Sequence, residues 1–365
     1  MRIAQVAPLY ESVPPRLYGG TERVVSWLTE ELVHEGHDVT LFASGDSLTN
    51  ARLVPVCSRA LRLDPKCVDS LAHHINLVER VMQAKDEFDI IHFHIDYLHF
   101  GMSRRDRLPQ LTTLHGRLDI PDLAPLYREF YEMPVVSISD SQRAPLPWLN
   151  WHGTVHHGMP TDTLEPGLAP GQYLAFLGRV SPEKGLDKAI DIALRAEIPL
   201  KIAAKVDRTD REYFESHIKP RLNSDLIEFI GEISDLEKND FFSKALAFLF
   251  PINWSEPFGI VLIESLACGV PIVAFPLGSV PEIVEDGVSG FLVNSAEEAA
   301  RTLKNIDVID RRKCREIFET RFSAKRMAQE YVSIYQRIAK PEAETIALTD
   351  GDLRWMKLEP PSSTT

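Results

Sequence analysis

Short apolar runs alternate with longer amphipathic stretches along almost the whole chain. The apolar runs occupy residues 2–7, 38–43, 88–94, 110–115, 135–139, 173–178, 200–204, 226–231, 246–250, 271–275 and 290–293. Runs this apolar predict strands that are covered on both faces. Helical periodicity separates them, for example at residues 21–36, 183–197, 259–268 and 296–304. Strand and helix in repeated alternation predict an α/β fold with parallel, doubly wound sheets.

The alternation pauses at residues 160–172, "PTDTLEPGLAPGQ", which hold three prolines and two glycines. This composition predicts an interdomain linker. We therefore expect two Rossmann-like domains of similar size, at residues 1–165 and 170–317, whose sheets face each other across a cleft. Ligands of such sheets bind at the carboxyl ends of the strands, so the site is expected in that cleft. Residues 318–340 predict a last amphipathic helix, and residues 341–365 form a polar tail without periodicity.

Composition and charge narrow the class of function. The net charge of −13 disfavours a general nucleic-acid binder, which needs a basic face, and weakens docking on anionic lipid to at most a peripheral membrane contact. No apolar run approaches the roughly 20 residues of a membrane helix, and "MRIAQVAPLY" has no signal-peptide pattern. The four cysteines form no CxxC pair, which indicates reduced thiols. We therefore expect a cytoplasmic protein.

The segment "EPFGIVLIE", residues 256–264, places two carboxylates at the ends of an apolar run. Pro257 disfavours helix for Glu256, so a helix is expected to begin near residue 258 and to contain Glu264. Its first amides, which point into the cleft at the positive end of the helix dipole, belong to Phe258, Gly259, Ile260 and Val261. A ligand with a central diphosphate and a hydroxyl-rich sugar at each end fits this arrangement. The alternative is a loop glutamate and a partly exposed helix glutamate.

Two further segments point to the same ligand. In "GRVSPEKG", Arg179 and Lys184 follow a predicted strand, where two cations would neutralise a leaving diphosphate. In "LYGGTERVV", Gly19 and Gly20 precede a predicted helix and would allow close approach of the backbone to a ligand. The alternatives are a solvated turn with ordinary surface charges and an ordinary glycine turn.

Together these segments resemble the retaining family 4 glycosyltransferases of the GT-B fold. The resemblance covers about residues 1–338 and rests on "EPFGIVLIE", "GRVSPEKG", "YGGTERVV" and "LACGVPIVAFPLGSVPEIVEDGVSGFLV". The EX7E spacing is specific in combination with the later "GVPIVA" and "GVSGFLV", whereas the motifs of the first half are weaker. The resemblance implies that the last helix crosses back to pack on the first, acceptor-side domain.

The resemblance also implies roles for the matching residues of the second domain. Glu264 would bind the ribose hydroxyls of a nucleotide donor, and Glu256 would hold hydroxyls of the transferred sugar. Arg179 and Lys184 would stabilise the leaving diphosphate, and the four amides at the helix start would bind phosphate and sugar. The backbone of Ile233 would contact the base.

In the first domain, Gly19 and Gly20 would approach the phosphate, and His115 in "TTLHGR" matches a histidine near the reacting face of the sugar. The alternative for His115 is a structural bond to a carbonyl at the strand end. His92 and His94 in "DIIHFHID" suggest metal binding, but no third ligand of matching spacing follows. His94 is the better candidate of the two for a position near the acceptor.

We therefore expect a retaining, metal-independent glycosyltransferase without a cofactor. It would move a hexose from a UDP-, GDP- or ADP-linked donor to a hydroxyl of a sugar, lipid-linked sugar or small molecule. "DGD" at residues 350–352 lies in the polar tail with no strand before it, so it is not read as a metal motif. The alternatives are a nucleotide-sugar epimerase, a disaccharide phosphorylase, or a nucleotide-sugar-binding protein without turnover. A dehydrogenase is disfavoured because no GxGxxG follows a predicted strand.

Overall fold

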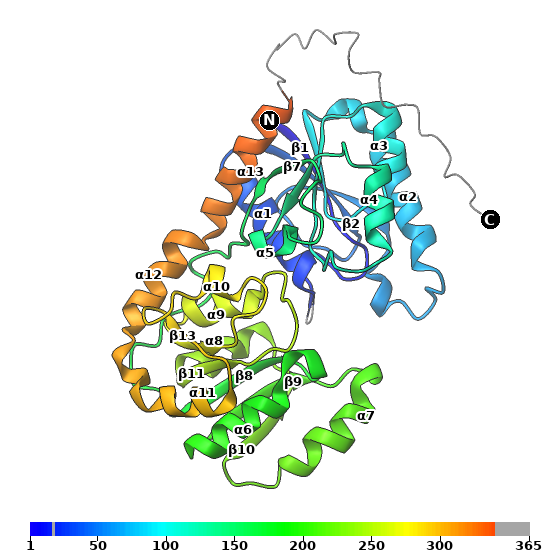
Figure 1. Ribbon diagram of the computed structural model, residues 1–365. Coiled ribbons are helices and arrows are strands. Elements are labelled where there is room, and N and C mark those ends of the chain that lie inside the picture. Colours follow the sequence, from blue (N-terminus) through cyan, green and yellow to red (C-terminus); the bar gives the residue numbers. More distant parts are fainter. Residues whose placement is uncertain (17–18, 340–365) are drawn as a thin grey trace, which may run out of the picture.

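The computed structural model describes residues 1–16 and 19–339, and it consists of two α/β units that lie one above the other in Figure 1. The first sheet has the strand order β3 (Arg52–Cys57), β2 (Asp38–Ser44), β1 (Arg2–Val6), β4 (Ile90–Phe93), β5 (Gln110–Thr113), β6 (Val135–Ser137) and β7 (Trp151–Thr154). The second has the order β10 (Ile227–Gly231), β9 (Leu200–Lys205), β8 (Tyr173–Arg179), β11 (Ala245–Phe250), β12 (Ile272–Ala274) and β13 (Gly290–Leu292). All strand pairings within these sheets are parallel. The predicted pair of parallel sheets is confirmed.

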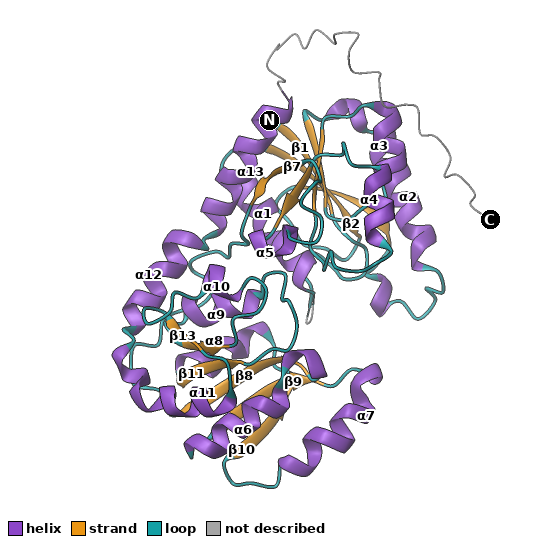
Figure 2. Cartoon of the chain, viewed as in Figure 1, coloured by secondary structure: helices purple, strands orange, loops and turns teal. Residues whose placement is uncertain are grey.

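Helices accompany both sheets, as Figure 2 shows. In the first unit they are α1 (Gly20–His34), α2 (Ser70–Gln83), α3 (Phe100–Asp106), α4 (Leu123–Glu129) and α5 (Asp140–Arg143). In the second they are α6 (Leu186–Ala196), α7 (Arg211–Tyr213), α8 (Asp235–Ser243), α9 (Ile260–Ala267), α10 (Val280–Ile283) and α11 (Ala296–Thr302). The chain then continues into α12 (Arg311–Arg321) and α13 (Ala324–Ala339).

Two strands, β3 and β7, were not predicted from the hydrophobic pattern. They are the two edge strands of the first sheet, and their residues are half-buried or exposed. Strand β3 carries Pro55, which removes one ladder donor and suits an edge. An edge strand pairs with only one neighbour, and its outer edge faces away from the sheet, so it does not need a continuous apolar run.

The predicted single helix at 318–340 is wrong, because the helix breaks at Phe322 and Ser323. Met159, just before the interdomain linker, donates its N–H to the carbonyl of Phe322 and accepts from the N–H of Ala324, both at 2.9 Å. A Cβ on Gly158 would lie 2.2 Å from the carbonyl oxygen of Ser323, so the two crossing segments require glycine there. Backbone bonding between these segments therefore interrupts the helix.

The break divides the end of the chain between two cores. Phe318 of α12 packs in the core of the second unit, whereas Met327, Tyr331 and Tyr335 of α13 pack in a core of the first unit. In Figure 1, α13 runs beside the first sheet, and α12 lies beside the second unit. Lys340 and the expected tail, with its "DGD" segment, lie outside the described residues.

Candidate active site

A cavity of about 880 Å³ lies between the two units, and residues of both line it. All the residues that were predicted from the sequence to form the site are among its lining residues. They are Gly19, Gly20, His115, Arg179, Lys184, Ile233, Glu256, Phe258, Gly259, Ile260, Val261 and Glu264. The fold thus brings together segments that are up to about 245 positions apart in the chain.

The loop between β11 and α9 carries Glu256, which is buried. Its Oε2 atom lies 2.5 Å from the Nζ of Lys184, and that ammonium also stands 4.8 Å from the ring centroid of Trp254. The indole Nε1 of Trp254 is buried without a hydrogen-bond partner in the described structure. Lys184 and Glu256 therefore form an ion pair at the cavity wall, beside the indole N–H of Trp254, which has no acceptor among the described residues.

The loop from residue 275 to residue 279 braces the backbone at Glu256. The N–H of Ser279 donates to the carbonyl of Glu256 at 2.9 Å, and its hydroxyl donates to the carbonyl of Phe258 at 2.8 Å. Gly278 has φ +64°, and a Cβ there would lie 2.3 Å from the nitrogen and the oxygen of Glu256. The position of the Glu256 carboxylate therefore depends on a glycine in the neighbouring loop.

Helix α9 begins at Ile260 after Gly259, whose φ of +81° suits glycine. The amides of the first helical turn have no acceptor within the helix, and they lie at its positive end. Gly20, at the start of α1, faces this point: a Cβ on it would lie 3.5 Å from the Cδ1 of Ile260. The N-terminal ends of α1 and α9 therefore meet across the cavity, although α1 also carries Glu22 in its first turn.

Gly19 differs from the expectation that its missing side chain admits a ligand. A Cβ there would lie 2.7 Å from the Cβ of Pro15 and 3.2 Å from the Cγ of Glu11. The absence of a side chain therefore makes room for the chain's own residues, and only Gly20 opens toward the second unit.

Glu264 is buried in α9, and its Oε1 atom accepts from the Nζ of Lys238 at 2.7 Å. Lys238 also lies 3.0 Å from Asp235, which in turn pairs with Arg23 of α1. Burial opposes the charge of Lys238, but the carboxylates of Glu264 and Asp235 together outweigh it and raise the pKa of the lysine. A row of alternating charges thus connects the first unit to the glutamate inside α9.

Arg179 ends strand β8, and two carboxylates share its guanidinium group. Its side-chain nitrogens lie 3.3 Å from Glu183 and 3.3 Å from Asp210. An anion that enters the cavity would therefore compete with these two acids for Arg179, as it would compete with Glu256 for Lys184.

His115 lies on the first-unit wall of the cavity, just after β5. Its Nε2 is 2.9 Å from the Nδ1 of His94, and its ring stacks on that of His157 at 5.3 Å. Burial lowers the pKa of His115 to about 3, so the imidazole is neutral near pH 7. Both ring nitrogens of His92 bond to hydroxyl groups, of Tyr335 and Thr113, at 2.7 Å. His92 is therefore held by the protein's own groups.

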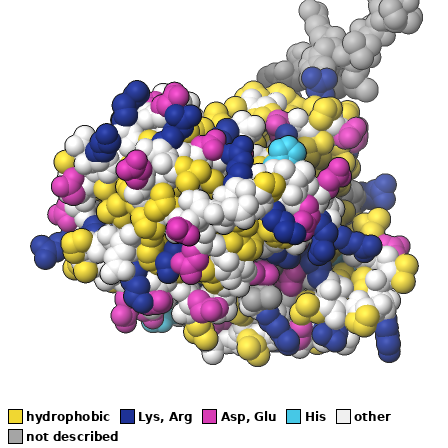
Figure 3. All heavy atoms as spheres, turned by 90° about the horizontal axis from the view of Figure 1, so that it is seen from below, with side chains coloured by type: hydrophobic (Ala, Val, Ile, Leu, Met, Phe, Trp, Pro, Cys, Tyr) yellow, Lys and Arg dark blue, Asp and Glu magenta, His cyan; other side chains and the backbone are white. Residues whose placement is uncertain are grey.

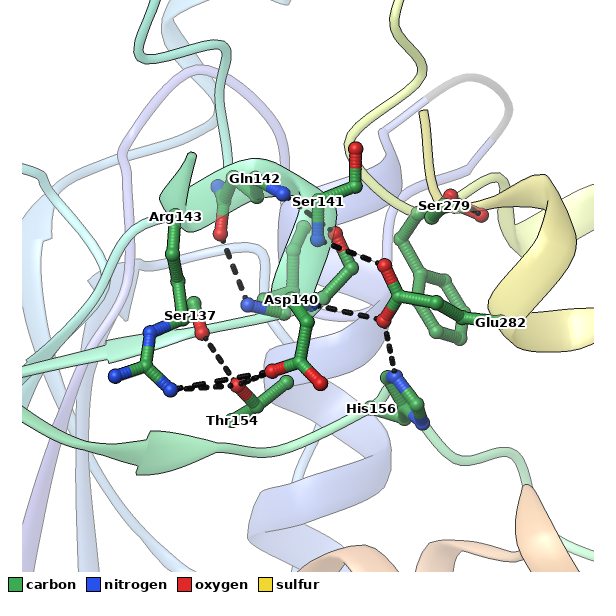
Figure 4. Close-up of polar contacts among 12 residues, drawn as sticks. Ser137, Asp140, Ser141, Gln142, Arg143, Thr154, His156, Ser279 and Glu282 are labelled. Atoms are coloured by element: carbon green, nitrogen blue, oxygen red, sulfur yellow. Dashed lines mark hydrogen bonds and ion pairs between the residues drawn. The ribbon is translucent and has the colours of Figure 1, made fainter. Parts of the chain in front are cut away.

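Glu282 of α10 joins the two units, as Figure 4 shows. Its carboxylate accepts from the backbone N–H of Asp140 at 2.8 Å and of Ser141 at 2.7 Å, and it lies 3.0 Å from the Nε2 of His156. Burial opposes ionisation, but these partners hold the pKa of Glu282 below its usual value. Close by, the hydroxyl of Ser139 donates to the carbonyl of Pro257 at 2.7 Å. These contacts connect the two units.

Among the cavity-lining residues that were not predicted are Arg23, Lys238, Trp254 and His157. For Lys238 and Arg23, nothing in the sequence indicates that they pair with Glu264 and Asp235. Trp254 did give a signal, as a large aromatic residue in the loop "INWSEPFG". His157 lies between β7 and the interdomain linker, and only the fold shows that it reaches His115.

Other features bear on metals, membranes and charge. The part of the chain that the structure describes contains no group of three or more His, Cys, Asp or Glu side chains placed to hold a metal ion. Within the same residues, no helix combines the length and the apolar character needed to cross a membrane. On the face shown in Figure 3, Lys and Arg side chains are interspersed with Asp and Glu side chains.

Comparison with protein families gives two matches, one for each unit. Residues 18–151 match the model of "Glycosyltransferase Family 4", and residues 168–321 match that of "Glycosyl transferases group 1". Each model alone covers less than half of the chain, and together they cover most of both units.

Curated relatives agree with these matches. The chain is 26% identical to a phosphatidyl-myo-inositol mannosyltransferase of Mycobacterium leprae over 82% of its length and 85% of that protein. It is 24% identical to O-antigen chain mannosyltransferase C of Escherichia coli, over 93% of its length and 100% of that protein. A match to an uncharacterized 41.2 kDa protein in the cps region of Klebsiella pneumoniae, 26% identical, spans only 45% of this chain and 46% of that protein.

Solved structures share the whole fold. Sucrose-phosphate synthase of Thermosynechococcus elongatus superposes with a TM-score of 0.76 at 20% identity, over 93% of this chain and 99% of that one. The Anabaena protein HepE in complex with UDP superposes with a TM-score of 0.70 at 18% identity, over 92% and 100%. At these identities the likeness shows the fold.

Proposed function

We propose that this chain, a glycosyltransferase of the GT-B type by its fold and by the family models that match its two halves, transfers a hexose from a nucleotide-diphosphate sugar to a hydroxyl acceptor. One observation carries the proposal. Glu256, Glu264, Arg179 and Lys184 all line a single cavity, around the N-terminal end of α9. Carboxylates accept from sugar hydroxyls, and cations with helix amides bind phosphate.

In the proposed complex, the diphosphate lies at the start of α9 and meets Arg179 and Lys184. Glu264 accepts hydrogen bonds from the ribose hydroxyls and keeps its ion pair with Lys238. Glu256 accepts hydrogen bonds from hydroxyls of the hexose. The Nε1 of Trp254, which has no partner among the described residues, is available to donate to the same ligand. The backbone of Ile233 contacts the base, and His115 faces the sugar from the first unit.

The chemistry follows from this placement. Departure of the nucleotide diphosphate leaves positive charge on the anomeric carbon, which the Glu256 carboxylate stabilises, and puts negative charge on the phosphate, which Arg179 and Lys184 stabilise. We propose that the reaction retains the anomeric configuration and needs no metal ion. The leaving phosphate takes the proton of the attacking hydroxyl, so no side chain has to act as a nucleophile.

The donor and the location are also part of the proposal. HepE was solved with UDP and with UDP-glucose, and two relatives are named mannosyltransferases, so glucosyl and mannosyl donors come first in a screen. The four cysteines are free thiols, which agrees with the proposed cytoplasmic location.

A thermal-shift screen with UDP, GDP, ADP and their sugar conjugates tests donor binding. A donor at 100 times its dissociation constant adds about 2.7 kcal/mol to the free energy of unfolding. Product analysis with a sugar acceptor and with inorganic phosphate then separates transfer from epimerisation and phosphorolysis. Binding of a sugar conjugate without any turnover would support the binding protein instead.

Two isosteric variants test the site itself. Glu256→Gln should lower kcat by about 10²-fold or more, because the carboxylate acts on charge that develops in the transition state. Glu264→Gln should mainly raise the donor KM, because its contacts with the ribose are the same in ground and transition states. Calorimetry with the free nucleotide diphosphate should show weaker binding only for Glu264→Gln. The opposite pattern would mean that the two roles are exchanged.

A further inference from the structure

A continuous chain of hydrogen bonds runs from helix α13 to the imidazole of His115. The side-chain amide of Gln5, buried on β1, donates through Nε2 to the hydroxyl of Tyr335 at 3.1 Å. Its Oε1 lies 2.8 Å from the Nε2 of His94. The Nδ1 of His94 lies 2.9 Å from the Nε2 of His115. The Nδ1 of His115 is buried and has no hydrogen-bond partner in the described part of the chain.

The chemistry of these groups fixes the position of each proton. The Oε1 of Gln5 is an acceptor only, so the Nε2 of His94 must carry the hydrogen. Burial keeps both His94 and His115 neutral near pH 7, and a neutral imidazole has one N–H and one bare nitrogen. The Nδ1 of His94 is therefore bare and accepts from the Nε2–H of His115. This leaves the Nδ1 of His115 bare and buried, on a residue that lines the cavity.

The other end of this row of hydrogen bonds accommodates the same orientation of the Gln5 amide. The hydroxyl of Tyr335 accepts from Gln5 and donates to the Nδ1 of His92 at 2.7 Å. The Nε2–H of His92 then donates to the hydroxyl of Thr113 at 2.7 Å. If the Gln5 amide were rotated by 180°, donor and acceptor would be exchanged in every hydrogen bond between Thr113 and His115. The Nδ1 of His115 would then carry a hydrogen.

We propose that Gln5 and Tyr335 are positioning residues that fix His115 as its Nε2–H tautomer, so that its Nδ1 accepts a hydrogen bond from a hydroxyl of the bound sugar. This inference rests on the proposed function for the sugar, but the tautomer itself does not. Because Tyr335 belongs to α13, the docking of this last helix on the first unit decides whether the Nδ1 of His115 is an acceptor or a donor. Neither residue lines the cavity, so both act through His94.

Three variants of the full-length protein distinguish a role in orienting His115 from a role in packing alone. Gln5→Met keeps the length of the side chain but removes the acceptor for His94. Tyr335→Phe removes only the hydroxyl that orients Gln5. Tyr173→Phe is the matched control, because Tyr173 is a buried tyrosine whose hydroxyl donates to the carbonyl of Phe241 at 2.7 Å, outside this row of hydrogen bonds.

Nitrogen-15 NMR of histidine-labelled protein measures the tautomer directly, with the His115 signals assigned from their loss in His115→Gln. We expect a bare Nδ1 and a protonated Nε2 in the wild type and in Tyr173→Phe. Gln5→Met and Tyr335→Phe should show a mixture of the two tautomers. A proton on Nδ1 in the wild type, or an unchanged tautomer in Gln5→Met, would overturn the proposal.

Kinetics and binding supply the second readout. The transfer rate from a UDP-sugar should fall about tenfold in Gln5→Met, as for the loss of one hydrogen bond, while the dissociation constant of UDP alone stays within about twofold of the wild type. Tyr173→Phe should keep the wild-type rate even if its melting temperature falls. Equal loss of rate in Tyr173→Phe and Gln5→Met would mean that packing alone is responsible. If no donor supports transfer, the proposed function fails, and the NMR result still decides the tautomer.

Discussion

Replacing Gly278 with alanine tests how the loop that carries Glu256 is held in place. Gly278 has φ +64°, and an added Cβ would lie 2.3 Å from two backbone atoms of Glu256 and 2.8 Å from the carbonyl carbon of Ser255. Gly287 provides a matched control: its φ is +73°, and a Cβ there meets no atom within 4 Å. The two substitutions therefore share the backbone strain and differ in the steric contact.

The magnitudes follow from this difference. A left-handed conformation costs an L-residue about 1–2 kcal/mol, so Gly287→Ala should lose about that much stability. Overpacking adds about 1–3 kcal/mol in Gly278→Ala, because the contacted atoms are backbone and cannot rotate away. For a domain of this size, each kcal/mol corresponds to about 2–4 °C in Tm. Gly278→Ala should therefore melt at least about 2 °C below the control.

Activity should separate the two variants more sharply than stability does. Relief of the contact at Gly278 moves the loop, and a shift of about 1 Å in a group that acts on the reacting atoms can cost on the order of 10²-fold in rate. Gly287→Ala should keep the wild-type rate. Urea unfolding and transfer assays on both variants provide the measurement. If the two variants lose the same stability and the same rate, the close approach of Gly278 does not position Glu256.

Transfer should survive EDTA, because Arg179, Lys184 and the α9 amides offset the diphosphate charge; abolition by EDTA with rescue by manganese would contradict this. The protein should lose stability as the pH falls below about 6.5, because five histidines have strongly lowered pKa values in the folded state and the unfolded chain takes up protons first, at about 1.4 kcal/mol per pH unit for each histidine. They are His92, His94, His99, His115 and His157. Urea unfolding at pH 7 and 5.5 checks this, and equal stabilities would refute it. Glu282→Gln should lower the free energy of unfolding at pH 7 by about 1–3 kcal/mol. Because the pKa of Glu282 is lowered in the folded state, its contribution is present at neutral pH and lost in acid, so the difference from wild type should shrink below about pH 4. A difference that is independent of pH would argue against the ionised contact.

The order of strands and helices was predictable because it depends on local patterns. Apolar runs of strand length predicted most strands of both sheets, and the "EPFGIVLIE" segment predicted the helix start near Gly259 that the structure shows at α9. The position of the cavity followed from a general property of parallel sheets. Strand β3 escaped prediction because Pro55 interrupts its apolar run, and β7 because its residues, WHGT, contain no such run.

Sequence alone determined which residues are present at the ends of the strands, and for which chemistry they are suited. Tertiary structure decided with whom they pair: Lys238 with Glu264, Glu282 with an amide 142 positions away, and His94 with Gln5, 89 positions away. It also broke the last helix at Phe322, where a crossing segment takes the backbone hydrogen bonds. The physical reason is the same in each case. Periodicity and helix capping are properties of neighbouring residues, whereas an ion pair or a shared proton depends on distances that only the packed chain sets.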